Sequence, residues 1–356
     1  MKALKVIWGI LKVFIALGII ALIPVMLLVG VQTSAPQTFQ AEEASIPDFS
    51  TTTSFSKVKA DLDAFLNSDP VQAKSQYELI PLSARAYKSI CETMKATRDV
   101  YSFVDCKTTM FPGTIMEIVV QGNRFTLKKD TEYYFTEYSI PGNTGLSGLA
   151  GAFSKENTTF ALRTYTNANM DYTYREKSYS PTFKVDENNV TVGIECDWSE
   201  GNRVPENLYK TESGQAPFCT NIKGEYFITD QNITEDTIKS ASVEYVKSES
   251  GNFYRFVIEL DTDNPVTTER SIDNLRAGGG DNARYTAMTE TIEIWESGYL
   301  KYFKSVDAWQ GSNVITINSV IDYTTYFFYD AKYMNPSSYL NFEEVKNAAL
   351  EYDANR

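Results

Sequence analysis

The chain has 356 residues, of which 43% are hydrophobic and 13% aromatic, so it can bury a sizeable core and is not expected to be disordered. Its formal net charge of −13 would repel phosphate backbones, which argues against nucleic acid as a partner. The chain contains no histidine, which excludes Ser-His-Asp and Cys-His nucleophile systems and zinc sites that use histidine ligands.

The N-terminal segment 13–31 is uncharged and long enough to cross the roughly 30 Å hydrocarbon core of a bilayer at about 1.5 Å per residue. Lys2, Lys5 and Lys12 precede this segment, and no basic residue follows it until Lys57. That asymmetry predicts a cytoplasmic N-terminus. We therefore expect a single-pass membrane protein whose main domain faces the extracellular space or the cell envelope.

A cleaved signal peptide is the alternative reading of this segment. Signal peptides usually have an apolar region of about 7–15 residues that ends in a small-x-small site. The best such site is Thr33-Ser34-Ala35, and Pro36 directly after it should hinder a peptidase. We therefore favour an uncleaved anchor. The expected organisation is a cytoplasmic tip and anchor at 1–31, a stalk at 32–53, and an α+β domain at 54–356 with a candidate boundary between two halves near residue 225.

Two helices are expected after the stalk. The first carries Val58, Leu62 and Phe65 at helical spacing, and Ser56 suits its N-cap. The second is expected to begin near Pro81, because proline suits the first position of a helix. Its predicted apolar stripe consists of Tyr87, Ile90, Cys91, Met94 and Tyr101.

From Gly113 onward, short runs rich in β-branched and aromatic residues are typical of an antiparallel meander. The expected strands of the first half are 115–120, 124–127, 132–138, 160–165, 172–174 and 183–198, with a turn at 121–123. Those of the second half are 243–246, 253–260, 291–296, 299–309 and 313–329. A helix at 341–352, with Phe342, Val345 and Leu350 directed inward, is expected to close the domain. The fold class is therefore mainly β (α+β): an antiparallel curved sheet, like half a barrel, packed on a few helices.

The chain has four cysteines, and none of them belongs to a C-x-x-C pair that would indicate a metal or redox motif. An even number in an exported chain suggests two disulfides. The preferred pair is Cys196–Cys219, because Cys196 ends a predicted strand and a connection rich in glycine and proline leads to Cys219. A Cys91–Cys106 bond would require the second helix to stop near Thr97, so that the chain could double back. The alternative for Cys91 is a small buried hydrophobic residue of the core.

Aromatic residues of the last strands are the candidate cavity residues. They would line an apolar cavity inside the curved sheet, and the alternative is an ordinary sheet core. The candidates are Trp295, Trp309, Tyr323, Tyr326 and Phe328.

Paired carboxylates are the remaining candidates for chemistry. Glu195 with Asp197, or Glu293 with Glu296, would be pairs of the glycosidase type, but such pairs arise by chance among 46 acidic residues. The run 261–264 resembles a fragment of a calcium loop but lacks the glycine and glutamate that complete one. We therefore expect no metal site and no cofactor.

The order of a helix, an antiparallel meander and later helices under a curved sheet resembles the bacterial lipoprotein-carrier fold. This group includes periplasmic lipoprotein localisation factors and related lipid-binding proteins of the cell envelope. The resemblance spans roughly residues 75–352 and is architectural, without a diagnostic motif, so no functional residue is carried over. It implies a ligand that is a lipid or another apolar molecule.

The predicted function is therefore a membrane-anchored extracytoplasmic binding domain for a lipid or another apolar ligand. The first alternative is a non-catalytic surface ectodomain that is structural or interacts with another surface protein. The second alternative is a carboxylate-dependent hydrolase. A large aromatic cavity would favour the first reading, and an exposed apolar patch would favour the surface ectodomain.

Overall fold

The computed structural model describes residues 53–68, 76–97, 99–114, 117–129, 132–141, 160–166, 173–178, 182–185, 191–195, 204–206, 228–312, 316–329 and 342–354. The predicted anchor and stalk lie outside these ranges. Within them, no helix combines the length and the apolar character that crossing a bilayer requires.

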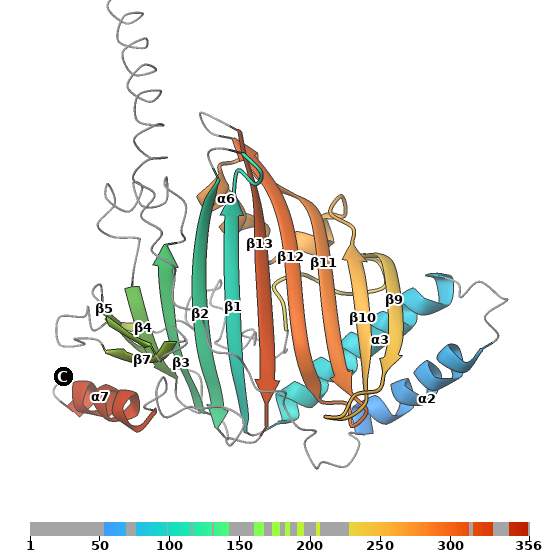
Figure 1. The fold of residues 1–356 in the computed structure, drawn as a ribbon, viewed down its shortest axis with the longest axis horizontal. Coiled ribbons are helices and arrows are strands. Elements are labelled where there is room, and N and C mark those ends of the chain that lie inside the picture. The colour runs from blue at the N-terminus through green and yellow to red at the C-terminus, as the bar shows by residue number, and fades with distance from the viewer. Residues whose placement is uncertain are drawn as a thin grey trace, which may run out of the picture.

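The described chain is dominated by antiparallel strands (Figure 1). The strands of the first half are β1 (Val100–Met110), β2 (Ile118–Lys129), β3 (Glu132–Pro141), β4 (Phe160–Thr166), β5 (Thr173–Ser178), β6 (Thr182–Val185), β7 (Thr191–Glu195) and β8 (Val204–Glu206). Those of the second half are β9 (Ile238–Val246), β10 (Phe253–Leu260), β11 (Arg284–Trp295), β12 (Leu300–Ser312) and β13 (Thr316–Phe328).

Within the described ranges, eleven of these strands form one open curved sheet in the order β8-β5-β4-β3-β2-β1-β13-β12-β11-β10-β9. Strands β6 and β7 pair separately as a hairpin. The first and last parts of the chain meet where β1 pairs with β13, for example at Val104 and Thr325. This long-range pairing makes the sheet continuous from the first meander to the final strands.

Helices lie on the sheet and at its ends. The described helices are α2 (Thr53–Asn67), α3 (Gln76–Ala96), α5 (Pro265–Thr268), α6 (Ile272–Gly279) and α7 (Phe342–Ala354). Helix α3 crosses one face of the sheet obliquely toward β9, with α2 beside it (Figure 1). At the other end of the sheet, α7 packs on β4, where Arg163 Nη1 lies 2.8 Å from Glu344 Oε1.

The hydrophobic core fills the space between α2, α3 and the sheet. Strand β10 presents alternate residues to it, because successive side chains of a strand point to opposite faces. Tyr254 and Phe256 are at most 1% exposed, whereas Val257 between the core positions is 37% exposed. From the helices, Leu62 and Ile90 meet this face with no exposed surface.

Several predicted boundaries differ from the structure. Helix α3 begins at Gln76, before Pro81, which lies inside the helix, and Tyr101 belongs to β1 rather than to the helical stripe. The turn expected at 121–123 is absent, because β2 runs straight through these residues in register with β1 and β3. In α7, Val345 is buried as expected, but Leu350 is 54% exposed.

The predicted Cys91–Cys106 disulfide is not formed. Helix α3 continues to Ala96, and after a short connection β1 starts at Val100 and extends straight through Cys106. An extended strand rises about 3.3 Å per residue, so Cys106 lies about 20 Å along β1 from Val100. The helix therefore ends where the bond requires it to, but Cys91 lies only about 8 Å before that end at 1.5 Å per residue, so the extended strand carries Cys106 much further from the turn than Cys91. Cys196 and Cys219 lie outside the described residues.

The free edge of β9 is paired with a side chain instead of a strand. The amide of Gln76, at the start of α3, donates from Nε2 to the carbonyl of Ala241 and accepts from its N–H through Oε1, both at 2.9 Å. An unpaired edge is a template for unwanted strand addition. Gln76 therefore both caps this edge and ties α3 to it.

Replacing Gln76 with alanine should speed hydrogen exchange at the Ala241 amide and lower the free energy of unfolding by about 1–2 kcal/mol, because two hydrogen bonds are lost. Exchange measured by NMR or mass spectrometry reports the first effect, and urea titration the second. Lys239→Ala, at an exposed position of the same strand, should change neither. Unaltered exchange at Ala241 in Gln76→Ala would contradict this role.

Candidate functional site

Two of the five aromatic candidates lie on the face of the sheet that the helices cover. Phe303 of β12 belongs to the core, and the alternation along β12 places Trp309 on the same face. Tyr323 of β13 pairs directly with Ser305, which also lies on this face. Trp309 is buried and Tyr323 is half-buried.

The other three candidates, Trp295, Tyr326 and Phe328, lie on the opposite face. Trp295 is fully buried, and its ring meets that of Phe253 edge-on with 5.9 Å between centroids. The ring of Tyr326 stacks on Phe103 across the β1–β13 pair, with 6.3 Å between centroids. The structure therefore divides the five side chains between two faces and does not bring them together around one space.

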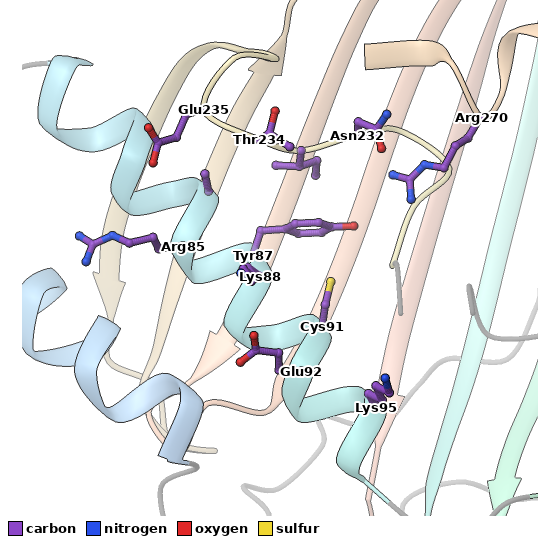
Figure 2. A pocket seen from close by; sticks show the side chains of 12 residues that line it. Arg85, Tyr87, Lys88, Cys91, Glu92, Lys95, Asn232, Thr234, Glu235 and Arg270 are labelled. Carbon is purple, nitrogen blue, oxygen red and sulfur yellow. The ribbon is translucent and has the colours of Figure 1, made fainter. Parts of the chain in front are cut away.

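A pocket of about 690 Å³ lies elsewhere, between α3 and the segment 232–235 (Figure 2). This volume falls within the range of about 300–1,000 Å³ that is usual for sites of small molecules. From α3 the pocket is lined by Ala84, Arg85, Tyr87, Lys88, Cys91, Glu92 and Lys95. The opposite wall consists of Asn232, Ile233, Thr234 and Glu235, with Arg270 at one end.

The floor of the pocket is apolar. Tyr87, Cys91 and Ile233 are buried and belong to the hydrophobic core, and Ala84 packs against that core. Tyr87 and Cys91 project from α3 toward Arg270, which reaches in from the far end (Figure 2). The floor can therefore receive the apolar part of a ligand.

The rim of the pocket is charged and exposed. Lys88, Glu92 and Lys95 follow one another at helical spacing along α3. Arg85 also borders the pocket but is engaged with Asp61 of α2, at 2.7 Å between Nη1 and Oδ2. The pocket thus combines an apolar floor with a charged rim that is exposed to solvent.

The thiol of Cys91 is held in its neutral form. Burial raises the pKa of Cys91 to about 12, against the smaller opposing effects of its hydrogen bonds with Tyr87 and the backbone of Ile228. The N–H of Ile228 also donates to the Tyr87 hydroxyl at 3.3 Å, which fixes that ring. A protonated thiol is a poor nucleophile, so Cys91 contributes shape rather than covalent chemistry.

Gln231 ties the upper wall of the pocket to the rest of the domain. Its Nε2 donates to Asp307 Oδ2 on β12 at 3.3 Å, and its Oε1 accepts from Ser271 Oγ at 3.0 Å. Its carbonyl accepts from Arg270 Nη2 at 2.7 Å. Gln231 is 2% exposed. Gln231, which directly precedes the pocket wall, is therefore anchored both to the sheet and to the turn before α6.

Asp307 belongs to a second feature, a close pair of carboxyl groups on the helix-covered face. Ser305 Oγ lies 3.2 Å from Glu290 Oε1 and 3.1 Å from Asp307 Oδ1. Burial, together with the charge of Asp307, raises the pKa of Glu290 well above its usual range. Burial raises the pKa of Asp307 to about 6. Glu290 has no exposed surface, so it cannot touch a substrate.

The carboxylate pairs singled out from the sequence are engaged differently. Glu293 accepts hydrogen bonds from Arg255 Nε and Lys301 Nζ, and Glu296 accepts from Asn252. Asp197, the proposed partner of Glu195, lies outside the described residues. The negative charge of Glu293 is therefore compensated by two cations, and its role is structural.

The run 261–264, which resembled part of a calcium loop, forms a capped turn. Asp261 Oδ1 accepts from the N–H of Asp263 at 3.0 Å, and Asn264 Oδ1 accepts from the N–H of Val266 to cap α5. Within the described ranges, no three His, Cys, Asp or Glu side chains are grouped so that they could hold a metal ion.

Sequence reasoning missed both the pocket and the Glu290–Asp307 pair. The pocket walls come from parts of the chain far apart in sequence, and the two acids sit on different strands. The one available signal is the predicted apolar stripe that contains Tyr87 and Cys91. Tyr87, Ile90, Cys91 and Met94 of this stripe belong to the core, and Tyr87 and Cys91 also form part of the pocket floor.

No family model matches this chain, and no curated protein matches it. Among solved structures, a LolA superfamily protein from Nitrosomonas europaea aligns at 9% identity and a TM-score of 0.20, over 68% of this chain and 94% of that one. MucB in complex with MucA(peri) aligns at 5% identity and a TM-score of 0.10, over 69% of this chain and 93% of that one. Likenesses with TM-scores this low carry no argument about the fold or the function of this chain.

Proposed function

We propose that the chain is a non-catalytic binding domain that holds a small amphiphilic ligand in the pocket beside α3. The observation that supports this most directly is the pocket of about 690 Å³, with its apolar floor and ionic rim. An amphiphile would place its apolar part over Tyr87, Cys91 and Ile233 and its polar group at the rim. Sites for small molecules commonly combine an apolar lining with a few polar groups in this way.

The state of the titratable groups supports binding over catalysis. Cys91 is a neutral thiol, Glu290 is inaccessible, and Glu293 is neutralised by two cations. In the proposal the domain lies outside the cytoplasm, tethered by residues 13–31, because Lys2, Lys5 and Lys12 precede that segment and no basic residue follows it until Lys57.

A surface-interaction ectodomain receives less support. The large hydrophobic residues that are exposed in the described chain belong to four separate elements, namely Tyr77 in α3, Val257 in β10, Val266 in α5 and Leu350 in α7. Single exposed apolar residues are normal on soluble domains and do not mark an interface. The pocket is therefore the better-supported binding feature.

Ala84→Trp would place an indole at the edge of the pocket floor. We expect it to weaken binding of a fluorescent fatty acid, such as cis-parinaric acid, by at least about tenfold, because the ring occupies the space of the ligand. Titration of the full chain measures this, and native mass spectrometry of the wild type looks for a co-purified amphiphile.

Ala277→Trp is the matched control, since Ala277 is exposed on α6 and does not line the pocket. It should bind the probe like the wild type. Thermal melting confirms that both variants are folded. Equal binding by Ala84→Trp and Ala277→Trp, or no binding by the wild type, would refute the proposed function.

A further inference from the structure

The side chains that line the pocket are more cationic than the chain as a whole. Four of them are cations and two are carboxylates, whereas the whole chain carries a formal net charge of −13. Arg85 is paired with Asp61 of α2. The cations that remain are Lys88, Lys95 and Arg270, against Glu92 and Glu235. An excess of positive charge in a strongly acidic protein favours an anionic ligand group over a neutral or cationic one.

Arg270 is the cation whose position is fixed. Its Nη2 donates to the carbonyl of Gln231 at 2.7 Å, and Gln231 is itself bonded to Asp307 and Ser271. A guanidinium presents its N–H groups in a planar fork that matches the two oxygens of a carboxylate or phosphate. Because Arg270 is already positioned, it loses little conformational freedom when an anion binds.

The guanidinium of Arg270 lies beside the apolar floor. Figure 2 shows Arg270 reaching from the far end toward Tyr87 and Cys91. Burial raises the pKa of Cys91, and the positive charge of Arg270 is one of the smaller effects that oppose this rise, so the guanidinium acts on the floor. An anion bound by Arg270 is therefore contiguous with the surface over which an apolar chain would lie.

The two carboxylates of the lining favour one orientation of such a ligand. Glu235 lies at the opposite end of the pocket from Arg270, where an anion would meet a like charge (Figure 2). Glu92 follows Lys88 by four residues and precedes Lys95 by three, positions that are neighbours on the surface of a helix. The charge of Glu92 is therefore flanked by two cations, and the Arg270 end is the better place for an anion.

We propose that the ligand of this pocket is an anionic amphiphile, whose carboxylate or phosphate group binds Arg270 and whose apolar chain lies over Tyr87, Cys91 and Ile233. Arg270 then determines the class of ligand, and Lys88 and Lys95 add positive charge at the rim. This inference rests on the proposed function, which it narrows from small amphiphiles in general to those with an anionic head group.

Probes that share an apolar chain but differ in head group test the proposal. The full chain is titrated at neutral pH with cis-parinaric acid and with its methyl ester, which has the same chain without the charge. The wild type should bind the acid about tenfold more tightly than the ester, the usual size for one hydrogen bond to a charged group. Dodecyl phosphate should displace the bound acid, whereas dodecanol and sodium phosphate at the same concentration should not.

Arg270→Gln should lower the affinity for the acid about tenfold, to the level of the ester, because the charged donor is lost. Arg276→Gln is the matched control, since Arg276 is exposed on α6 and does not line the pocket. It should bind both probes like the wild type. Thermal melting shows whether the variants are folded, and the comparison of acid with ester needs the wild type alone.

Equal affinity of the wild type for the acid and the ester would overturn the proposal without any variant, and so would an unchanged preference in Arg270→Gln. Displacement of the acid by sodium phosphate as readily as by dodecyl phosphate would mean that the site takes a free anion, which also overturns it. Ala84→Trp separates this inference from the proposed function, because it should weaken binding of acid and ester alike. If it does so while the wild type binds the two probes equally, the proposed function stands and the anionic head group does not.

Discussion

Phe256→Ala should lower the free energy of unfolding by about 3–5 kcal/mol, the usual cost of removing a buried phenylalanine. Phe256 is 1% exposed and lies in the core that joins β10 to α2 and α3. Its loss would leave a cavity in the core between the sheet and the helices. Urea unfolding followed by circular dichroism measures the change.

Val257→Ala provides the control, since Val257 is the next residue on the same strand and points to the other face, 37% exposed. This substitution should lower the free energy of unfolding by less than about 1 kcal/mol, because little packing is lost at a surface position. Similar costs for the two substitutions would mean that the helices do not cover the face of β10 that carries Phe256.

Glu293→Gln should destabilise the domain by about 2–3 kcal/mol, because it leaves two cations without their shared anion. Glu293 is 5% exposed and accepts from Arg255 Nε at 2.8 Å and from Lys301 Nζ. The expected cost stays below that of a fully buried pair, since the Arg255 side chain is 38% exposed and water compensates part of the loss. Urea titration at low and high salt measures it.

Glu244→Gln is matched to this change, because Glu244 binds the same guanidinium at 2.6 Å but has a side chain that is 58% exposed. It should cost no more than about 0.5–1 kcal/mol, and added salt should remove most of that effect. If Glu244→Gln were as harmful as Glu293→Gln, burial would not be what makes the Glu293 contacts strong.

The local spacing of apolar residues predicted those elements that face the core on one side along their whole length. The strand predicted at 253–260 is β10, with the same bounds. The spacing of Val58 and Leu62 identified α2 and its inward side. These predictions held because the period of the apolar residues directly reflects which side of an element meets the core.

Local pattern failed where a distant partner decides the conformation. Residues 121–123 have turn chemistry, yet the ladders to β1 and β3 on either side keep them extended. Tyr101 continues a helical stripe, but pairing with Phe328 and Leu127 places it in β1. Backbone hydrogen bonds to strands far away in sequence outweigh weak local preferences.

The candidate site shows the same division. The stripe with Tyr87 and Cys91 was visible in the sequence, because it repeats on one side of α3. That this stripe forms the floor of a pocket depends on Ile233 and Arg270, which come from parts of the chain far from α3 in the sequence. Likewise, Glu290 and Asp307 share the Ser305 hydroxyl only because β11 and β12 pair in this register. Sequence alone determined elements such as α2 and β10 and the absence of histidine chemistry. Strand register and helix placement, which are long-range properties, decided where the pocket and the acid pair lie.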